Sequence, residues 1–150
     1  MKLAWKRLDG RDGHRVGREL LAELVTPLPE ILVTERGKPY FRDSDLHFSI
    51  SHTKNHAFCV VSQQNIGIDA EEMGRPVSSK LAKHVLSPEE FARYEASDDP
   101  DDTLLRLWVQ KESYAKLTGR GWGNYLYETD FDPENVQIID GCYVSIVEDP

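Results

Sequence analysis

The spacing of apolar residues changes from a helical to a strand period within the first third of the chain. Between residues 13 and 25, apolar side chains recur every three or four positions, at Val16, Leu20, Leu21 and Leu24. This spacing predicts an amphipathic helix, which Pro27 and Pro29 should end. Between residues 46 and 51, strict alternation predicts a half-buried strand, and its polar face carries His47, Ser49 and Ser51.

Later apolar runs predict two hairpins. Residues 57–62 and 66–71 are rich in strand-forming side chains and are joined by a polar Gln-Gln-Asn segment, so we expect them to pair with each other. Residues 136–139 and 142–147 flank Asp140-Gly141, a strong two-residue turn signal. The sequence therefore predicts antiparallel pairs in the middle and at the end of the chain.

Helical patterns occupy the region between these hairpins. A short helical run is expected near residues 81–86, and Ser87-Pro88-Glu89-Glu90 supplies a capping box for a helix over residues 88–96. The longest helix should span residues 102–118 and end at Gly119, a common left-handed terminator. Strands grouped apart from helices indicate an α+β fold of small antiparallel sheets packed with helices.

Length and composition indicate a single domain over residues 1–150. Apolar residues make up 39% and charged residues 29%, and no apolar run approaches the length of a membrane helix. The first residues lack a secretory signal, so cytoplasmic localisation is the expectation. Cys59 and Cys142 lie in apolar stretches typical of buried free thiols.

The net charge of −8 argues against nucleic-acid binding, which requires a basic surface. The first 18 residues are an exception, with six basic residues against two aspartates. Such a segment could bind a polyanionic small molecule, although a solvated basic arm is the simpler interpretation.

Two carboxylates two residues apart give the first chemical signal. Asp69 and Glu71 should leave the same face of a strand, while Ile68 and Ala70 face the other way. Neighbouring acids repel unless a raised pKa, a basic partner or a hard cation compensates. An exposed polar strand face is the common alternative for an isolated Asp-x-Glu.

The long helix adds a mixed stripe, in which Trp108, Glu112 and Lys116 recur at every fourth position. A solvated Glu-Lys pair would contribute only about 0.3–0.5 kcal/mol. Since the indole favours burial, a cleft edge suits all three side chains better.

Three blocks of sequence, in order, carry a resemblance to a known family. They are residues 37–40 with 48–53, residues 67–71, and residues 107–116 with 119–121. Together they resemble the 4′-phosphopantetheinyl transferases, specifically the larger, surfactin-synthetase-activating (Sfp-like) class. The resemblance implies that class's fold in reduced pseudo-dimer form. It implies Mg²⁺-dependent transfer of phosphopantetheine from coenzyme A to a serine of an apo acyl or peptidyl carrier protein, a holo-[acyl-carrier-protein] synthase activity that releases 3′,5′-ADP.

The resemblance also implies residue roles. Asp69, Glu71 and Glu112 would bind Mg²⁺, and Glu112 and Lys116 would be catalytic, although which carboxylate is the general base stays open. The residues expected to contact coenzyme A are Arg15, Lys38, Ser51, His52, Lys111 and Lys116. Without the family, a loop-capping role would be the first interpretation of His52.

Both ends of the chain look shortened relative to the larger class, which would leave a sheet edge that homo-oligomerisation could cover. The length resembles the short trimeric synthases, but about 65 residues precede the Gly-Ile-Asp block, and this position favours the larger class. Two other functions stay open: a non-catalytic module that binds coenzyme A or a carrier protein, and another Mg²⁺-dependent phosphotransfer or phosphodiester enzyme that uses the same acids.

Overall fold

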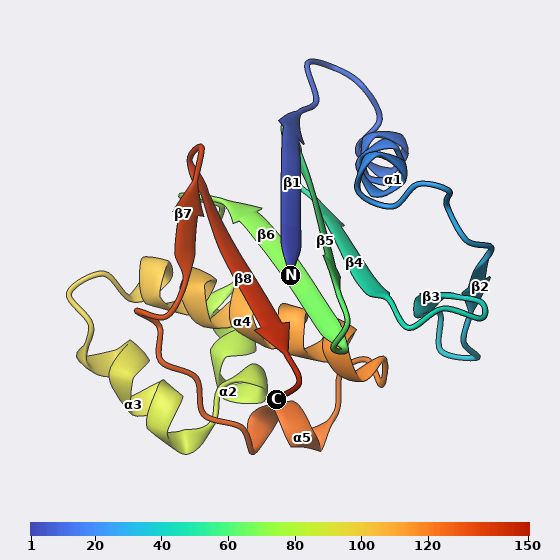
Figure 1. Cartoon of the computed structure of the whole chain (residues 1–150). Helices are drawn as coiled ribbons and strands as arrows, with labels where there is room; N and C mark the ends of the chain where they lie inside the picture. The colour runs from blue at the N-terminus through green and yellow to red at the C-terminus, as the bar shows by residue number, and fades with distance from the viewer.

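The computed structural model describes residues 1–150 and is an α+β structure (Figure 1). The strands are β1 (Lys2–Arg7), β2 (Ile31–Val33), β3 (Pro39–Phe41), β4 (His47–His52), β5 (His56–Ser62), β6 (Ile66–Glu72), β7 (Gln137–Ile139) and β8 (Cys142–Glu148). The helices are α1 (Gly13–Leu24), α2 (Ala82–Val85), α3 (Pro88–Ala96), α4 (Pro100–Thr118) and α5 (Asn124–Tyr127), and a 3₁₀ turn at Ser79–Leu81 precedes α2. No helix has the combined length and apolar character needed to cross a membrane.

Two three-stranded antiparallel sheets form the centre of the molecule, with strand orders β1-β5-β4 and β6-β8-β7. Helix α1 covers the outer face of the first sheet, and α4 covers the second sheet from the other side (Figure 1). The short β2–β3 hairpin lies at the margin beyond β4. The chain is therefore layered as helix, sheet, sheet and helix.

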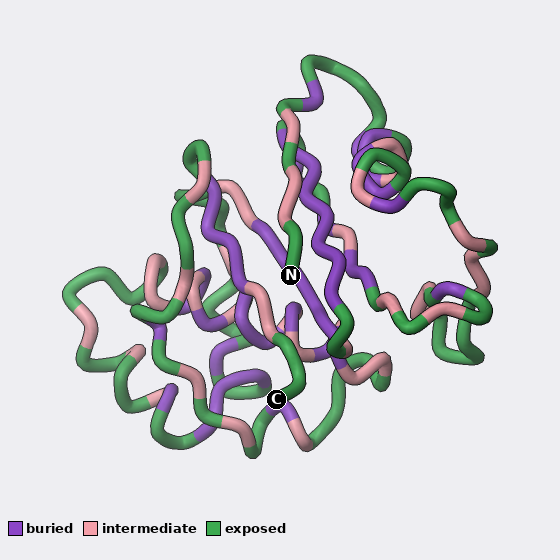
Figure 2. The backbone as a smooth tube through the Cα atoms, viewed as in Figure 1, coloured by how far each residue is buried: buried purple, intermediate pink, exposed green.

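Strand β5 is buried along its whole length because both of its faces pack into a core (Figure 2). Ala57, Cys59 and Val61 pack with the apolar face of α1, whereas Phe58 and Val60 pack against β6 and β8. The odd-numbered and even-numbered residues of β5 enter different cores because successive side chains of a strand point to opposite faces. The β5 strand thus joins the two cores.

Most of the predicted elements are confirmed. Helix α3 has the predicted capping box, and α4 ends at Gly119 with φ 68°, the left-handed conformation expected there. Helix α4 begins two residues earlier than predicted because Asp99 caps it by accepting a hydrogen bond from the Asp102 amide. The β7–β8 hairpin also forms, with positive φ at Asp140 and Gly141.

The predicted hairpin between residues 57–62 and 66–71 is wrong. Strand β5 already has β1 on one edge and β4 on the other, so neither edge is free for β6. Strand β6 instead pairs with β8 along seven residues. The polar Gln63–Asn65 segment is therefore a crossing between sheets, and the hairpin that does form in this region joins β4 to β5.

The basic start of the chain is also more ordered than a solvated arm. Residues 2–7 form edge strand β1, whose Leu3 and Ala4 pack toward the two cores on opposite faces of the sheet. Its lysines and arginine remain outside. The sequence prediction missed this strand because it contains too few apolar residues to establish a period.

Gly67 marks the closest approach of β6 to α4. A Cβ atom at Gly67 would lie 2.1 Å from the Ser113 carbonyl oxygen and 2.6 Å from the Leu117 amide nitrogen. Because both obstacles are backbone atoms, we expect Gly67→Ala to destabilise the protein by about 2–3 kcal/mol in urea unfolding. The matched control is Gly123→Ala, whose Cβ would meet nothing closer than 3.4 Å. Equal effects of the two substitutions would contradict this packing.

Candidate active site

A cavity of about 380 Å³ opens where α1, the β2–β3 hairpin, β4 and the C-terminal half of α4 meet. The chain therefore brings segments from both halves of the sequence to one opening. Its lining is strongly basic, with a single acidic residue, Glu112, among basic side chains. The basic residues are His14, Arg18, Arg36, Lys38, His52 and Lys116. In a chain of net charge −8, such a concentration of positive charge favours a polyanionic ligand.

Helix α4 contributes the predicted stripe. Trp108 stacks on Trp122 with ring centroids 5.1 Å apart, and the Trp122 indole donates a 3.0 Å hydrogen bond to Glu112 Oε1. The loop after α4 thus folds back over the stripe. Lys116, one turn beyond Glu112, donates to Asp69 Oδ1 at 3.0 Å and to the Ile50 carbonyl at 3.3 Å.

Asp69 is the most buried member of the predicted acid cluster, with 7% of its surface exposed. Its Oδ1 accepts hydrogen bonds from Ser51 and Lys116, but its buried Oδ2 has no hydrogen-bond partner. Burial raises the pKa of Asp69, and Lys116 and Ser51 only partly oppose this rise. A buried carboxylate oxygen without a partner is costly and indicates a missing cationic or donor group.

The other two acids are also electrostatically strained. Burial raises the pKa of Glu71, and repulsion from Asp69 and Glu112 adds to the increase. The pKa of Glu112 is raised by burial and then by repulsion from Asp69. Arg75 and Trp122 compensate incompletely, at 2.8 Å from Glu71 and 3.0 Å from Glu112. The structure therefore brings together the three predicted ligands in a region of excess negative charge.

These residues fit a hard divalent cation in their chemistry. All three offer carboxylate oxygens, which Mg²⁺ prefers, and the unpartnered Asp69 Oδ2 is a ligand atom without another role. Their oxygens do not all lie within 4.8 Å of one another. Glu71 and Glu112 would therefore have to turn from Arg75 and Trp122 to share one ion.

Ser51 is placed differently from the expectation that it contacts coenzyme A. It is buried outside the cavity lining, where its hydroxyl donates to Asp69 and accepts from the Ala70 amide at 3.1 Å. Ser49 likewise accepts from the Ile68 amide at 3.1 Å. The two serines attach β4 to β6, so Ser51 positions the acid cluster.

Lys38 and His52 do line the cavity. The Lys38 ammonium donates to Asn65 Oδ1 at 2.7 Å and to the Leu117 carbonyl, and burial lowers its pKa. Its aliphatic stem packs over Gly119, where a Cβ would approach to 2.9 Å. His52 lies against Gly13 at the start of α1.

The prediction for Lys111 requires correction. Its side chain is 0% exposed and forms a 2.7 Å ion pair with Glu90, and it also donates to the Leu126 and Thr129 carbonyls. Lys111 lies on the face of α4 that points away from the cavity, toward α3 and α5. Its ammonium is engaged in holding these elements and does not line the cavity.

Arg15 is also placed away from the cavity. It lies on the exposed face of α1 and pairs with Glu19 at 3.2 Å. His14 and Arg18 occupy the inner edge of the same helix and line the cavity. Sequence reasoning missed both, although their spacing of four residues and the phase of the buried positions Val16 and Leu20 could have indicated them.

The comparisons with known proteins agree with this fold. The family model of the 4′-phosphopantetheinyl transferase superfamily matches residues 65–142, which include all three predicted metal ligands. The chain therefore belongs to the 4′-phosphopantetheinyl transferase superfamily.

Individual relatives support the larger class. A 4′-phosphopantetheinyl transferase of Bacillus subtilis is 37% identical over 117 residues, covering 76% of this chain and 50% of the relative. The 4′-phosphopantetheinyl transferase Sfp of Bacillus subtilis strain 168 is 39% identical over 58% of this chain and 40% of its own length. AcpT of Escherichia coli O157:H7 is 34% identical over 73% and 58%. The chain spans about half the length of these curated relatives.

Proposed function

We propose that this chain transfers the phosphopantetheine group of coenzyme A to a serine of an apo acyl or peptidyl carrier protein, in a Mg²⁺-dependent reaction. The observation that carries the proposal is the contact between a basic cavity and a cluster of three strained carboxylates. The cavity suits the phosphates of coenzyme A, and the acids suit a divalent cation beside them. Membership of the superfamily supplies the reaction type.

Asp69, Glu71 and Glu112 are the residues that would hold Mg²⁺. When bound, this ion supplies charge neutralisation at the pyrophosphate oxygens. Lys116, which lines the cavity and contacts Asp69, adds a fixed positive charge at the boundary between acids and phosphates. Arg18, Lys38 and His52 would bind the remaining phosphates and orient the nucleotide.

The bonds that form and break in the proposed transfer show that a proton acceptor is needed in the site. The carrier serine oxygen forms a bond to the β-phosphorus of coenzyme A, the phosphorus bond to the bridging oxygen breaks, and 3′,5′-ADP leaves. The serine proton must be taken up as this happens. Glu112 is our candidate base because it is the acidic residue that lines the cavity.

Arg18 provides a direct test of the cavity as a coenzyme A site. It lines the cavity. Unlike Arg15, which pairs with Glu19, Arg18 forms no hydrogen bond or ion pair, so its guanidinium is free for phosphate. We expect Arg18→Gln to weaken coenzyme A binding by about 10-fold or more in calorimetry, since a charge-assisted hydrogen bond contributes about 1.5–3 kcal/mol. Arg15→Gln, on the exposed face of α1, is the matched control. A larger loss from Arg15→Gln would instead support Arg15 as the phosphate ligand.

The function itself is tested by incubating the chain with coenzyme A, Mg²⁺ and a panel of apo carrier proteins. Intact-protein mass spectrometry should show one added phosphopantetheine on at least one carrier. Tight coenzyme A binding with no adduct on any carrier would identify a non-catalytic binding module instead.

A further inference from the structure

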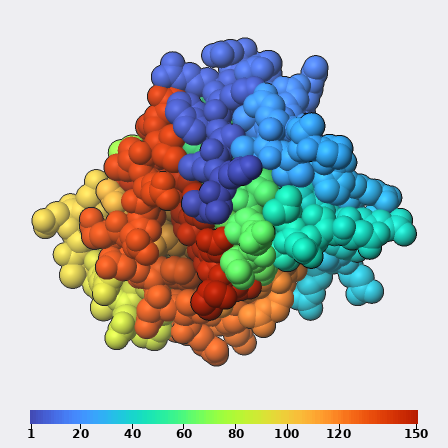
Figure 3. Space-filling model, in the orientation of Figure 1, coloured from blue at the N-terminus to red at the C-terminus, as the bar shows by residue number.

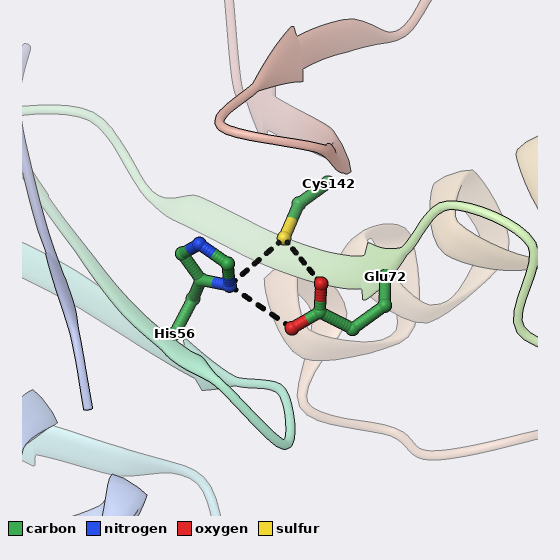
Figure 4. Close-up of side chains that lie close together, drawn as sticks. All are labelled: His56, Glu72 and Cys142. Atoms are coloured by element: carbon green, nitrogen blue, oxygen red, sulfur yellow. Dashed lines mark hydrogen bonds and ion pairs between the residues drawn. The ribbon is translucent and has the colours of Figure 1, made fainter. Parts of the chain in front are cut away.

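A second group of metal-ligating side chains lies outside the cavity, at the end of the molecule where three strands meet. His56 begins β5, Glu72 ends β6 and Cys142 begins β8, and their side chains converge (Figure 4). Glu72 and Cys142 are register partners in the second sheet, and His56 reaches them from the first sheet. Because neighbouring residues of a strand alternate, Glu72 lies on the opposite face of β6 from Glu71.

The distances between the three groups are close to those of a tetrahedral metal site. His56 Nδ1 lies 2.9 Å from Glu72 Oε1 and 3.3 Å from Cys142 Sγ, and Cys142 Sγ lies 3.5 Å from Glu72 Oε2. Zinc bonds of about 2.0–2.3 Å at tetrahedral angles separate neighbouring ligand atoms by about 3.3–3.6 Å. Adjustments of about half an ångström would therefore admit the ion.

The ligands are held in orientation by a surrounding layer of hydrogen bonds. Asp140 Oδ2 lies 2.8 Å from His56 Nε2 and would keep a proton on that nitrogen. His56 Nδ1 faces Glu72 Oε1 at 2.9 Å, so it would bind a metal only after losing its own proton. Arg7 holds Asp140 through two hydrogen bonds of 2.7 Å. Thr53 donates to Glu72 at 2.6 Å. Metal-binding histidines commonly have this kind of carboxylate partner.

An ion also has a route to this group. His56 and Cys142 are buried, but the Glu72 side chain is 26% exposed. A second cavity, of about 350 Å³, borders His56 and Asp140 and is lined by Arg7, Asp9, Gly10 and Asn55 as well. The surface view shows the N-terminal segment packed against the C-terminal hairpin in this part of the molecule (Figure 3).

We propose that His56, Glu72 and Cys142 form a zinc-binding site that fastens β5 of the first sheet to β6 and β8 of the second. A thiolate and an imidazole select zinc over Mg²⁺, which prefers oxygen ligands alone, so this site and the acid cluster would bind different ions. Binding replaces the protons on the Cys142 thiol and on His56 Nδ1 with the metal and releases both to solvent. With three protein ligands, water would take the fourth position of the tetrahedron, and the ion would act by holding the three strands together.

The test is metal binding by the full chain, with Co²⁺ as a spectroscopic substitute and then with Zn²⁺. We expect one equivalent of Co²⁺ to produce a thiolate-to-cobalt charge-transfer band, and Zn²⁺ to displace it and raise the melting temperature. Cys142→Ala should abolish the band and weaken zinc binding at least about 100-fold, and Asp140→Asn should weaken it about 10–100-fold. Cys59→Ala removes the other buried cysteine and should change neither.

Two results would overturn the proposal. One is a wild-type protein that binds zinc no more tightly than Cys142→Ala, which would leave His56 as the centre of a hydrogen-bonded network with Glu72 and Asp140 alone. The other is cobalt binding without a thiolate band. The wild-type spectrum does not depend on any variant, so a failure of Cys142→Ala to fold would not remove the test.

Discussion

Glu112→Gln is expected to leave the fold intact and to lower the rate of phosphopantetheine transfer by about 100-fold or more. The substitution removes a charge from the cation site and a proton acceptor from the cavity, while Gln can still accept the Trp122 hydrogen bond. The raised pKa of Glu112 means that its charged form destabilises the folded state. In Mg²⁺-free buffer at neutral pH, the variant should therefore melt no lower than the wild type.

Transfer rates from intact-protein mass spectrometry and melting curves by circular dichroism would measure both effects. Glu95→Gln is a matched control, because Glu95 lies on an exposed face of α3 away from the cavity. Unchanged transfer by Glu112→Gln would remove Glu112 from the proposed site. A marked loss of stability would instead show that the carboxylate supports the fold.

The second large effect concerns the buried pair of Lys111 and Glu90. Lys111→Met should destabilise the protein by about 3–5 kcal/mol, because it leaves a carboxylate that is 1% exposed without its cation. The Leu126 and Thr129 carbonyls lose their donor as well. Combining Lys111→Met with Glu90→Gln removes the charge and keeps an acceptor for the Ser87 amide, so the double variant should recover part of the loss.

Urea unfolding would give these free energies, provided that the variants and the wild type have the same m-value, the slope of the unfolding free energy against urea concentration. Lys6→Met is the control, since it breaks the exposed Lys6–Glu23 pair, and such pairs contribute at most about 1 kcal/mol. If Lys111→Met cost no more than Lys6→Met, the Lys111 pair would not be a structural clamp.

Local patterns in the sequence were sufficient to predict the main helices and the strand face that carries Asp69 and Glu71. Capping residues determine where α3 begins, Gly119 ends α4, and alternation places Asp69 and Glu71 opposite Ile68 and Ala70. Each of these depends on neighbours within a few residues. Local periods placed Asp69 and Glu71 on one strand face and Glu112 on one helix stripe, whereas their role as metal ligands was implied by the family resemblance.

Contacts between segments that are far apart in the sequence could not be predicted from such local patterns. The choice of β8 as the partner of β6 depends on which strand edges are already occupied, which no local pattern contains. The same limit explains Lys111, whose partner Glu90 becomes adjacent only when α3 packs on α4. The helical phase could place Arg18 on the inner edge of α1, but the cavity that it lines forms only where α1 packs beside β4.

The most direct test of the central claim compares the two products of transfer by the purified chain. With coenzyme A, Mg²⁺ and an apo carrier that the chain modifies, holo-carrier and 3′,5′-ADP should appear in equal amounts. Neither should form when EDTA replaces Mg²⁺ or when the acceptor serine of the carrier is changed to alanine. Absence of both products in the complete reaction, across acyl and peptidyl carriers, would contradict the account.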